Sequence, residues 1–295
     1  MITNIQSTVK ILKTIYKKAE KQNFKKKLLD RSIQKEIKFF NENDWLIQRN
    51  LIDKKILKKI KEKIKKKLNY KNIYPPKDCS FIDKKNYKKV LNYNNQSWHN
   101  FPKMNSEDIK KGLNTWKKKS SYVIIKNSHL LAPEIIKIAK EKKINEILNG
   151  YYPKSKFKLR FAKVILSFAN KIFPIDTQLF HSDFDSARLV KVFLYLDDVL
   201  SAKDGPTQFI EGTNVYKNKN AKKLEKLPMR LTDNLIKKNF KKNKKKSFIG
   251  KAGDALFLNT GILHRGKKPK IRNREILILS YCIHDEIYST QKSLF

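Results

Sequence analysis

Cysteine is almost absent from the sequence: the 295 residues include only Cys79 and Cys282. Two cysteines cannot build the disulfide framework that stabilises small secreted proteins. No apolar run approaches the roughly 18 residues that a transmembrane helix needs, and the segment "MITNIQSTVKILKTIYKKAEKQ" lacks the apolar core of a secretory signal. These absences favour a reduced, cytoplasmic protein without a membrane segment.

Acidic residues and arginine are also scarce. The chain has 68 Lys and Arg against 27 Asp and Glu, a formal net charge of +41, yet only eight of the basic residues are arginine. Arginine is the side chain best suited to bidentate contacts with phosphate and guanine. The lysines are spread among Asn and Ile, and all three have A/T-rich codons, so genome composition explains the bias. We therefore do not expect a nucleic-acid partner, although the excess of lysine is compatible with an anionic substrate.

The first half of the chain has mainly helical patterns. Residues 1–38 are predicted to form a Lys-rich N-terminal helical extension, and residues 39–295 a single domain. The segment "WLIQRNL" reads as a short strand. Asp53 is then expected to cap a helix whose apolar residues recur at a spacing of four, namely Ile56, Ile60 and Ile64.

A second helical region is predicted at residues 106–149. Pro133 suits the first turn of a helix there, and Gly150 suits its C-terminal cap. Between the two helical regions, residues 69–105 contain a Pro-Pro pair and Asn clusters that favour loops.

The second half of the chain has short β-rich segments separated by turn residues. They are "KFKLRFAKVILSFA", "ARLVKVFLYLDDV", "TQFIEGT", "KAGDALFLNT" and "REILILSYCI". Several short strands at this spacing favour a barrel or jelly roll packed with the helices in an α+β domain. Residues 214–249 form a Lys-rich insert, either a lid or a mobile loop.

Three side chains could bind a metal ion. His181 and Asp183 stand two residues apart at the start of a predicted strand, where i and i+2 share a face. His264 follows a later apolar run, and two His with one carboxylate form the facial triad of non-haem Fe(II) enzymes. The His181–Asp183 spacing alone also fits a hydrogen-bonded surface pair, but His264 and Arg274, following in order, favour iron.

Arg274 opens the strand "REILILSYCI", and a guanidinium buried there needs an anionic partner. The distal carboxylate of 2-oxoglutarate would serve, bound bidentately. A salt bridge to Glu275 or Glu286 is the alternative, and Arg272 is a competing anchor.

Four segments together resemble the phytanoyl-CoA dioxygenase family of Fe(II)/2-oxoglutarate oxygenases. They are "FHSDFD" followed by "RLVKVFLYLDDV", then "DGPTQFIEGTN", "KAGDALFLNTGILHRG", and the Arg274 strand. The resemblance extends over residues 39–285. It implies an α+β fold in which a double-stranded β-helix (a cupin-like jelly roll) is flanked by α-helices, including N-terminal ones.

The resemblance also implies roles for particular residues. His181, Asp183 and His264 would be the Fe(II) ligands, and Arg274 would bind the tail of 2-oxoglutarate. Two residues match positions that contact the co-substrate in some relatives, namely Gln178 and Thr207. The sequence departs from the family pattern in two places: "EGTN" replaces Pro-Gly-Ser-His, and Gly266 replaces a serine near the co-substrate.

The expected activity is oxidative hydroxylation of a small molecule, converting 2-oxoglutarate and O2 to succinate, CO2 and a hydroxylated product. Because Asp183 is a carboxylate, oxygen insertion is expected rather than halogenation. Two alternatives remain open: an oxidative demethylase acting on nucleic acid, and an inactive β-helix binding protein. The sequence does not indicate an oligomeric state or a particular substrate.

Two further side chains near the triad stay ambiguous. Strand alternation places Lys191 opposite Val190 and Val192, which suits either solvent exposure or a place in the pocket. Asp185 shares the expected face of Asp183 and is either a partner of the metal site or a solvated loop residue.

Overall fold

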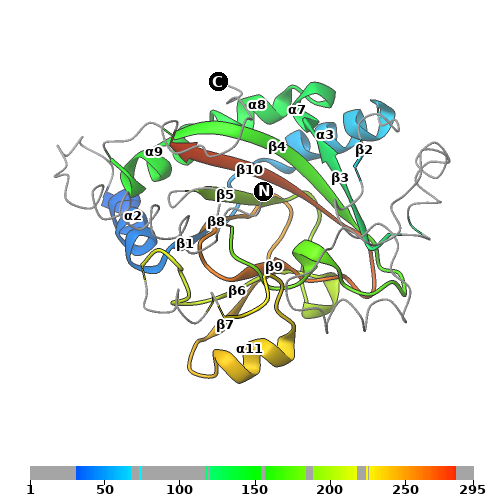
Figure 1. Ribbon diagram of the computed structural model, residues 1–295. Coiled ribbons are helices and arrows are strands. Elements are labelled where there is room, and N and C mark those ends of the chain that lie inside the picture. Colours follow the sequence, from blue (N-terminus) through cyan, green and yellow to red (C-terminus); the bar gives the residue numbers. More distant parts are fainter. Residues whose placement is uncertain are drawn as a thin grey trace, which may run out of the picture.

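Two antiparallel β-sheets form the centre of the molecule in the computed structural model (Figure 1). The structure describes residues 31–67, 73–74, 117, 120–153, 157–183, 189–217, 224 and 226–283. The large sheet has seven strands in the order β1-β8-β5-β10-β4-β3-β2, and the small sheet has three in the order β7-β6-β9. This arrangement confirms the expected α+β jelly roll.

The strands of the large sheet are β1 (Trp45–Gln48), β2 (Ile73–Tyr74), β3 (Tyr122–Lys126), β4 (Phe157–Ser167), β5 (Val190–Tyr195), β8 (Ala255–Asn259) and β10 (Arg274–Ile283). Those of the small sheet are β6 (Thr207–Ile210), β7 (Lys245–Phe248) and β9 (His264–Gly266). All five β-rich segments of the sequence therefore contain strands. Among the described residues every strand pairing is antiparallel.

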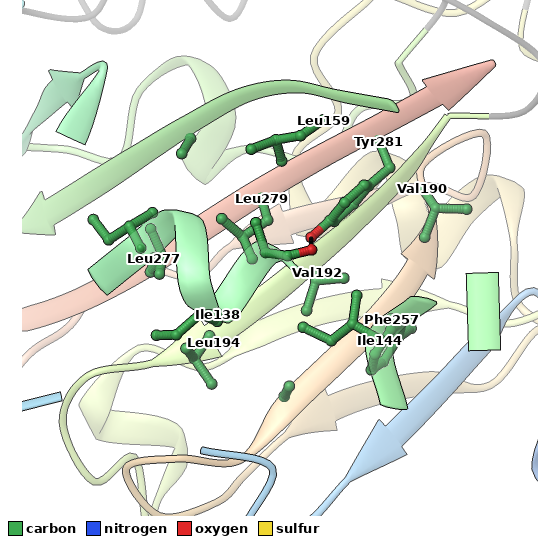
Figure 2. Close-up of a cluster of buried hydrophobic side chains, with 14 of the residues drawn as sticks. Ile138, Ile144, Leu159, Val190, Val192, Leu194, Phe257, Leu277, Leu279 and Tyr281 are labelled. Carbon is green, nitrogen blue, oxygen red and sulfur yellow. Dashed lines mark hydrogen bonds between the residues drawn. The ribbon is translucent and has the colours of Figure 1, made fainter. Parts of the chain in front are cut away.

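Both faces of the large sheet are covered, which explains the nearly continuous apolar runs of its central strands. Alternate residues of β5 point to opposite faces: Val190 and Val192 belong to a core on the helix side, whereas Phe193 belongs to a second core between the sheets. Figure 2 shows the helix-side core, where the Tyr281 hydroxyl donates a hydrogen bond to the carbonyl of Ala139 (2.9 Å). A third cluster lies under the small sheet, against the helix α11.

The helices lie mainly on one side of the large sheet (Figure 1). They are α2 (Arg31–Asn43), α3 (Lys54–Lys67), α7 (Ser128–Leu131), α8 (Glu134–Ala139) and α9 (Lys142–Tyr151), with α11 (Asp233–Asn239) on the opposite side. The described residues also include two short 3-10 helices, η3 (Asp176–Gln178) and η4 (Ala202–Asp204).

Helix α3 begins as expected, because the Asp53 carboxylate accepts a hydrogen bond from the backbone N–H of Lys55 (2.6 Å). Its buried residues are Leu57, Ile60 and Ile64, while Ile56 is 39% exposed. The expected apolar face was therefore wrong at one position. Spacings of three and four both keep residues on one helical face, and tertiary packing selects Leu57.

The predicted helical region at residues 106–149 is wrong in its middle, where the structure has strand β3. Its residues "YVIIK" are β-branched and aromatic, and they pair with β4. Gly150 is likewise no cap, because α9 continues to Tyr151. A Cβ built on Gly150 would lie 2.2 Å from Cδ1 of Ile37 in α2, so the glycine allows two helices to approach closely.

One predicted boundary and the character of the predicted insert differ from the structure. Helix α2 crosses the boundary expected at residue 38, and its Phe40 is fully buried, so this helix belongs to the packed domain. Residues 1–30 of the expected extension lie outside the described residues. The insert at 214–249 is more than a loop, because its described part supplies α11 and β7.

No helix among the described residues is long and apolar enough to cross a membrane.

Candidate metal centre

The two predicted histidines face each other across a backbone bridge at the edge of the small sheet. The N–H of His181 donates to the carbonyl of His264 (2.9 Å), and the N–H of His264 donates to the carbonyl of His181 (2.8 Å). His264 is also the first residue of β9, which pairs with β6. Backbone pairing thus fixes the separation of two residues that are far apart in the sequence.

Each imidazole is oriented for metal binding by a hydrogen bond to the backbone carbonyl two residues earlier in the chain. The Nδ1 atom of His181 lies 2.9 Å from the carbonyl oxygen of Leu179, and that of His264 lies 2.9 Å from the carbonyl oxygen of Ile262. Each carbonyl requires a proton on Nδ1, which leaves the lone pair on Nε2. The two rings are tilted, with centroids 4.4 Å apart.

Asp183 completes the cluster. Its Oδ1 lies 3.9 Å from Nε2 of His181, and its Oδ2 lies 3.7 Å from Nε2 of His264. One ligand atom from each of the three side chains lies within 4.8 Å of the others. The backbone N–H of Asp183 donates to the carbonyl of Thr260 (2.8 Å), which ties this loop to the end of β8. The structure therefore brings together all three residues that the sequence predicted.

Burial and charge keep these groups in their ligating forms. Burial lowers the pKa of His264 to about 4, against an opposing effect of Asp183. The pKa of His181 is also well below its ordinary value, first through burial and then through repulsion from His264 and Arg230. Burial alone would raise the pKa of the Asp183 carboxyl, but Lys191 and the two histidines hold it well below the usual range. Neutral imidazoles and an ionised carboxylate are the forms that bind a divalent metal.

Lys191 resolves an ambiguity of the sequence in favour of the pocket. The residue is 8% exposed, and its Nζ lies 2.5 Å from Oδ2 of Asp183. Strand alternation was correct in placing it opposite Val190 and Val192. Alternation does not reveal, however, that the opposite face is covered by a second sheet. Asp185 lies outside the described residues.

Arg274 is buried in the same cavity and has no acidic partner in the part of the chain that the structure describes. Its guanidinium donates to the carbonyl of Gly205 and to the hydroxyl of Ser167 (3.1 Å), while its Nε has no hydrogen-bond partner. Burial lowers the pKa of this guanidinium, and the only opposing influence comes from Tyr195. No carboxylate among the described residues pairs with it, so the expected alternative of a bridge to Glu275 is wrong. Glu286 lies outside the described residues.

Arg272, the competing anchor, is already engaged. Its Nε donates to Oδ1 of Asp204 (2.7 Å), and its side chain is 49% exposed. Asp204 in turn accepts hydrogen bonds from the backbone N–H groups of Leu200 and Ser201. Arg272 therefore stabilises the η4 turn outside the cavity, and Arg274 is the arginine that lines it.

Gln178 and Thr207, which the family resemblance placed near the co-substrate, also line the cavity. The Thr207 hydroxyl is buried and has no hydrogen-bond partner, so it is available to a ligand. The Gln178 amide oxygen instead accepts from the Ser121 hydroxyl (2.8 Å) and from the N–H of Ile175 (3.2 Å). Gly266 leaves room beside Arg274, because a Cβ built there would lie 3.1 Å from Nη2 of Arg274.

One cluster beside His181 was missed from the sequence. Asp176 adopts a positive φ of 42° and accepts hydrogen bonds from Nε and Nη2 of Arg230 (3.0 and 2.8 Å). The hydroxyl of Tyr122 donates to its other oxygen (2.7 Å). Neither the backbone conformation nor a contact across 54 residues leaves a local signal in the sequence. Through Arg230, the cluster connects the insert to the segment that carries His181.

Comparison with known proteins supports this view of the fold. No protein-family model matches the chain, and no curated protein matches it by sequence. Solved structures do match. They include the non-haem α-ketoglutarate-dependent carbocyclase SnoK from nogalamycin biosynthesis, with 10% identity, a TM-score of 0.53, and coverage of 86% of this chain and 84% of that one. The chain has the fold of the non-haem, 2-oxoglutarate-dependent enzymes.

Two further matching structures have a metal bound. HygX from Streptomyces hygroscopicus, with nickel and 2-oxoglutarate bound, has 12% identity, a TM-score of 0.53 and coverage of 89% of both chains. EctD from S. alaskensis, with bound Fe, has 10% identity, a TM-score of 0.54, and coverage of 88% of this chain and 78% of that one. At the level of the fold, the resemblance to the phytanoyl-CoA dioxygenase family is confirmed.

Proposed function

We propose that the protein is an Fe(II)/2-oxoglutarate-dependent oxygenase that hydroxylates a small organic molecule. The observation that carries this proposal is one cavity lined by both histidines of a preoriented His-Asp-His cluster and by a buried arginine that has no acidic partner among the described residues. The triad offers a divalent metal three protein ligands on one side, and the arginine offers an anion a place beside it.

The donor set fits ferrous iron. His181 and His264 would bind through Nε2 because backbone carbonyls hold their Nδ1 protons, and Asp183 would supply one carboxylate oxygen. When bound with 2-oxoglutarate and O2, the iron supplies the oxidising power that places one oxygen atom in a C–H bond of the substrate and the other in succinate, with release of CO2. The protein contributes ligation, orientation and exclusion of water.

The cavity also fits a 2-oxo acid with a second carboxylate. The Arg274 guanidinium has an unused Nε–H, and Thr207 has an unused hydroxyl. Between this end of the cavity and the triad lie Phe193, Ile276 and Ile278, which form an apolar wall and exclude water. An anion with its far carboxylate at Arg274 would therefore extend toward the metal ligands.

We propose hydroxylation rather than epimerisation because no side chain in the described lining of the cavity is placed to return a hydrogen atom to the substrate. Epimerisation at carbon requires a group that returns a hydrogen atom from the opposite side, such as a phenol or a thiol. Among the described residues that line the cavity, Tyr122 is the only tyrosine and no cysteine is present. The Tyr122 hydroxyl donates a hydrogen bond to Asp176 and is therefore not directed at a substrate.

The test is an optical titration without oxygen. We expect the purified protein to give a weak visible charge-transfer band when Fe(II) and 2-oxoglutarate are both present, because the keto acid would chelate the metal. Asp183→Ala should abolish the band, while Glu42→Ala, which removes an exposed carboxylate at the end of α2, should leave it unchanged. Absence of the band in the wild type would refute the proposed function.

A positive band leads to the search for the substrate. Succinate release would be measured against a metabolite library, with single-stranded oligonucleotides included. Stimulation by oligonucleotides alone would favour the demethylase alternative over a small-molecule hydroxylase.

A further inference from the structure

The two oxygens of the Asp183 carboxylate have different surroundings. Each lies near one imidazole, Oδ1 at 3.9 Å from Nε2 of His181 and Oδ2 at 3.7 Å from Nε2 of His264. Only Oδ2 also lies against an ammonium group, because it accepts a hydrogen bond from Nζ of Lys191 (2.5 Å). Lys191 is the only described residue that donates a hydrogen bond to this carboxylate. One oxygen is therefore held by a cation, and the other is left for a metal ion.

Lys191 projects from a fixed position in the middle of the large sheet. Its backbone pairs with Leu258 of β8 on one side and with Ser280 of β10 on the other. A strand with neighbours on both sides cannot shift without breaking two ladders of hydrogen bonds. The residue is 8% exposed, so little water reaches its ammonium group. The sheet thus presents a buried positive charge to the loop that carries Asp183.

The backbone of Asp183 is held separately from its side chain. Its N–H donates to the carbonyl of Thr260 (2.8 Å), and its carbonyl accepts a hydrogen bond from the hydroxyl of Tyr216 (3.2 Å). Neither contact involves the carboxylate, so they do not select its rotamer. The hydrogen bond from Lys191 does, and it decides which oxygen is turned toward the ammonium.

The ammonium group makes Oδ2 an unfavourable ligand for a divalent cation. A metal bound through both carboxylate oxygens would have to approach the oxygen that Lys191 already contacts, and two positive charges at so short a separation repel strongly in a buried site. A metal bound through Oδ1 alone has the carboxylate between itself and the ammonium. The charge-assisted hydrogen bond to Oδ2 is then kept. The arrangement favours ligation by a single oxygen.

We propose that Lys191 is a positioning residue that restricts Asp183 to one metal-binding oxygen, Oδ1. The inference rests on the proposed function and deepens it. A six-coordinate metal held by His181, His264 and one oxygen of Asp183 keeps three positions free. A carboxylate bound through both oxygens would take a fourth, and only the two positions that a chelating keto acid needs would remain. Lys191 thereby keeps the last position available to O2.

The test counts the water molecules on a bound metal and does not depend on turnover. The full chain is saturated with Mn(II) without 2-oxoglutarate, and the metal-bound waters are counted from the broadening of the Mn(II) electron paramagnetic resonance lines in H₂¹⁷O. We expect three waters in the wild type. Lys191→Met should lose one of them, because both carboxylate oxygens become free to bind. Lys191→Arg keeps a charged donor and should restore the third water.

Two further variants complete the experiment. Lys242→Met removes an exposed lysine just beyond α11 and should keep all three waters. Lys191→Leu is a second neutral replacement, and circular dichroism verifies the fold of each variant. If neither neutral variant folds, the wild-type count decides alone: three waters support the restriction to one oxygen, and two refute it.

Three results would overturn the inference. They are two waters in the wild type, three waters in both neutral variants of Lys191, and two waters in Lys191→Arg. A merely structural role of Lys191 would lower the stability of the neutral variants and leave their water count unchanged. Failure of the proposed function has a different signature, the missing charge-transfer band of the wild type with Fe(II) and 2-oxoglutarate. The water count is made without 2-oxoglutarate and keeps the two questions separate.

Discussion

Replacing Arg274 by methionine should separate ligand binding from stability. The guanidinium is fully enclosed, donates to Gly205 and Ser167, and lacks an acidic partner among the described residues. Methionine has a similar length and needs no hydrogen bonds. The substitution therefore removes a buried charge and the two hydrogen bonds that the guanidinium donates to neutral acceptors.

The expected magnitudes follow from these contacts. Two lost hydrogen bonds cost roughly 1 kcal/mol each, while removal of an unpaired buried charge returns a desolvation cost of about the same size or larger. The free energy of unfolding of the metal-free protein should thus change by less than about 2 kcal/mol. Binding of 2-oxoglutarate should lose two charge-assisted hydrogen bonds, about 3–6 kcal/mol, which corresponds to roughly 10²- to 10⁴-fold in affinity.

The assay pairs urea denaturation of the metal-free protein with the anaerobic optical titration by 2-oxoglutarate. Arg274→Lys should give an intermediate affinity, because it keeps the charge but not the bidentate geometry. The reasoning is refuted if Arg274→Met unfolds more easily by over 3 kcal/mol while its affinity for 2-oxoglutarate is unchanged. That result would make Arg274 a structural residue.

Three other predictions concern single positions. Thr207→Val should leave stability unchanged or slightly higher, since it removes an unpartnered buried hydroxyl, and should weaken 2-oxoglutarate binding several-fold in the optical titration. Gly150→Ala should lower stability by about 1–3 kcal/mol in urea denaturation because its Cβ overlaps Ile37, whereas the exposed neighbour change Asn149→Ala should not. Asp204→Asn should lower stability at neutral pH by about 1–3 kcal/mol. Hydrogen bonds place the folded pKa of Asp204 below 3.8 despite burial, so its contribution is present above pH 3.8 and is lost as pH falls through the lowered pKa; the difference between wild type and variant should shrink in acid.

The β half of the fold and the triad could be predicted from the sequence because their signals are local. Alternating and β-branched runs mark the strands, and the His-x-Asp spacing with a later histidine marks the ligands. The secondary structure of the helical half was harder to predict from the sequence. A five-residue strand, β3, lies between polar segments in a region of helical periodicity, and only its pairing with β4 shows that it is a strand.

Other features depend on contacts that a linear pattern does not contain. The role of Gly150 comes from the approach of α2, and the burial of Lys191 comes from the second sheet above it. The ion pair of Asp176 with Arg230 joins two loops whose proximity follows only from the closed jelly roll. Sequence patterns thus identified the chemistry of the site, and the folded chain identified the residues that surround it.

The reciprocal backbone hydrogen bonds between His181 and His264 have a consequence for assembly. Because the two histidines belong to segments that are far apart in the sequence and are held together by these bonds in the folded chain, an unfolded chain should lack the chelating geometry. Metal uptake should consequently follow folding rather than guide it, and added metal should slow unfolding without accelerating refolding.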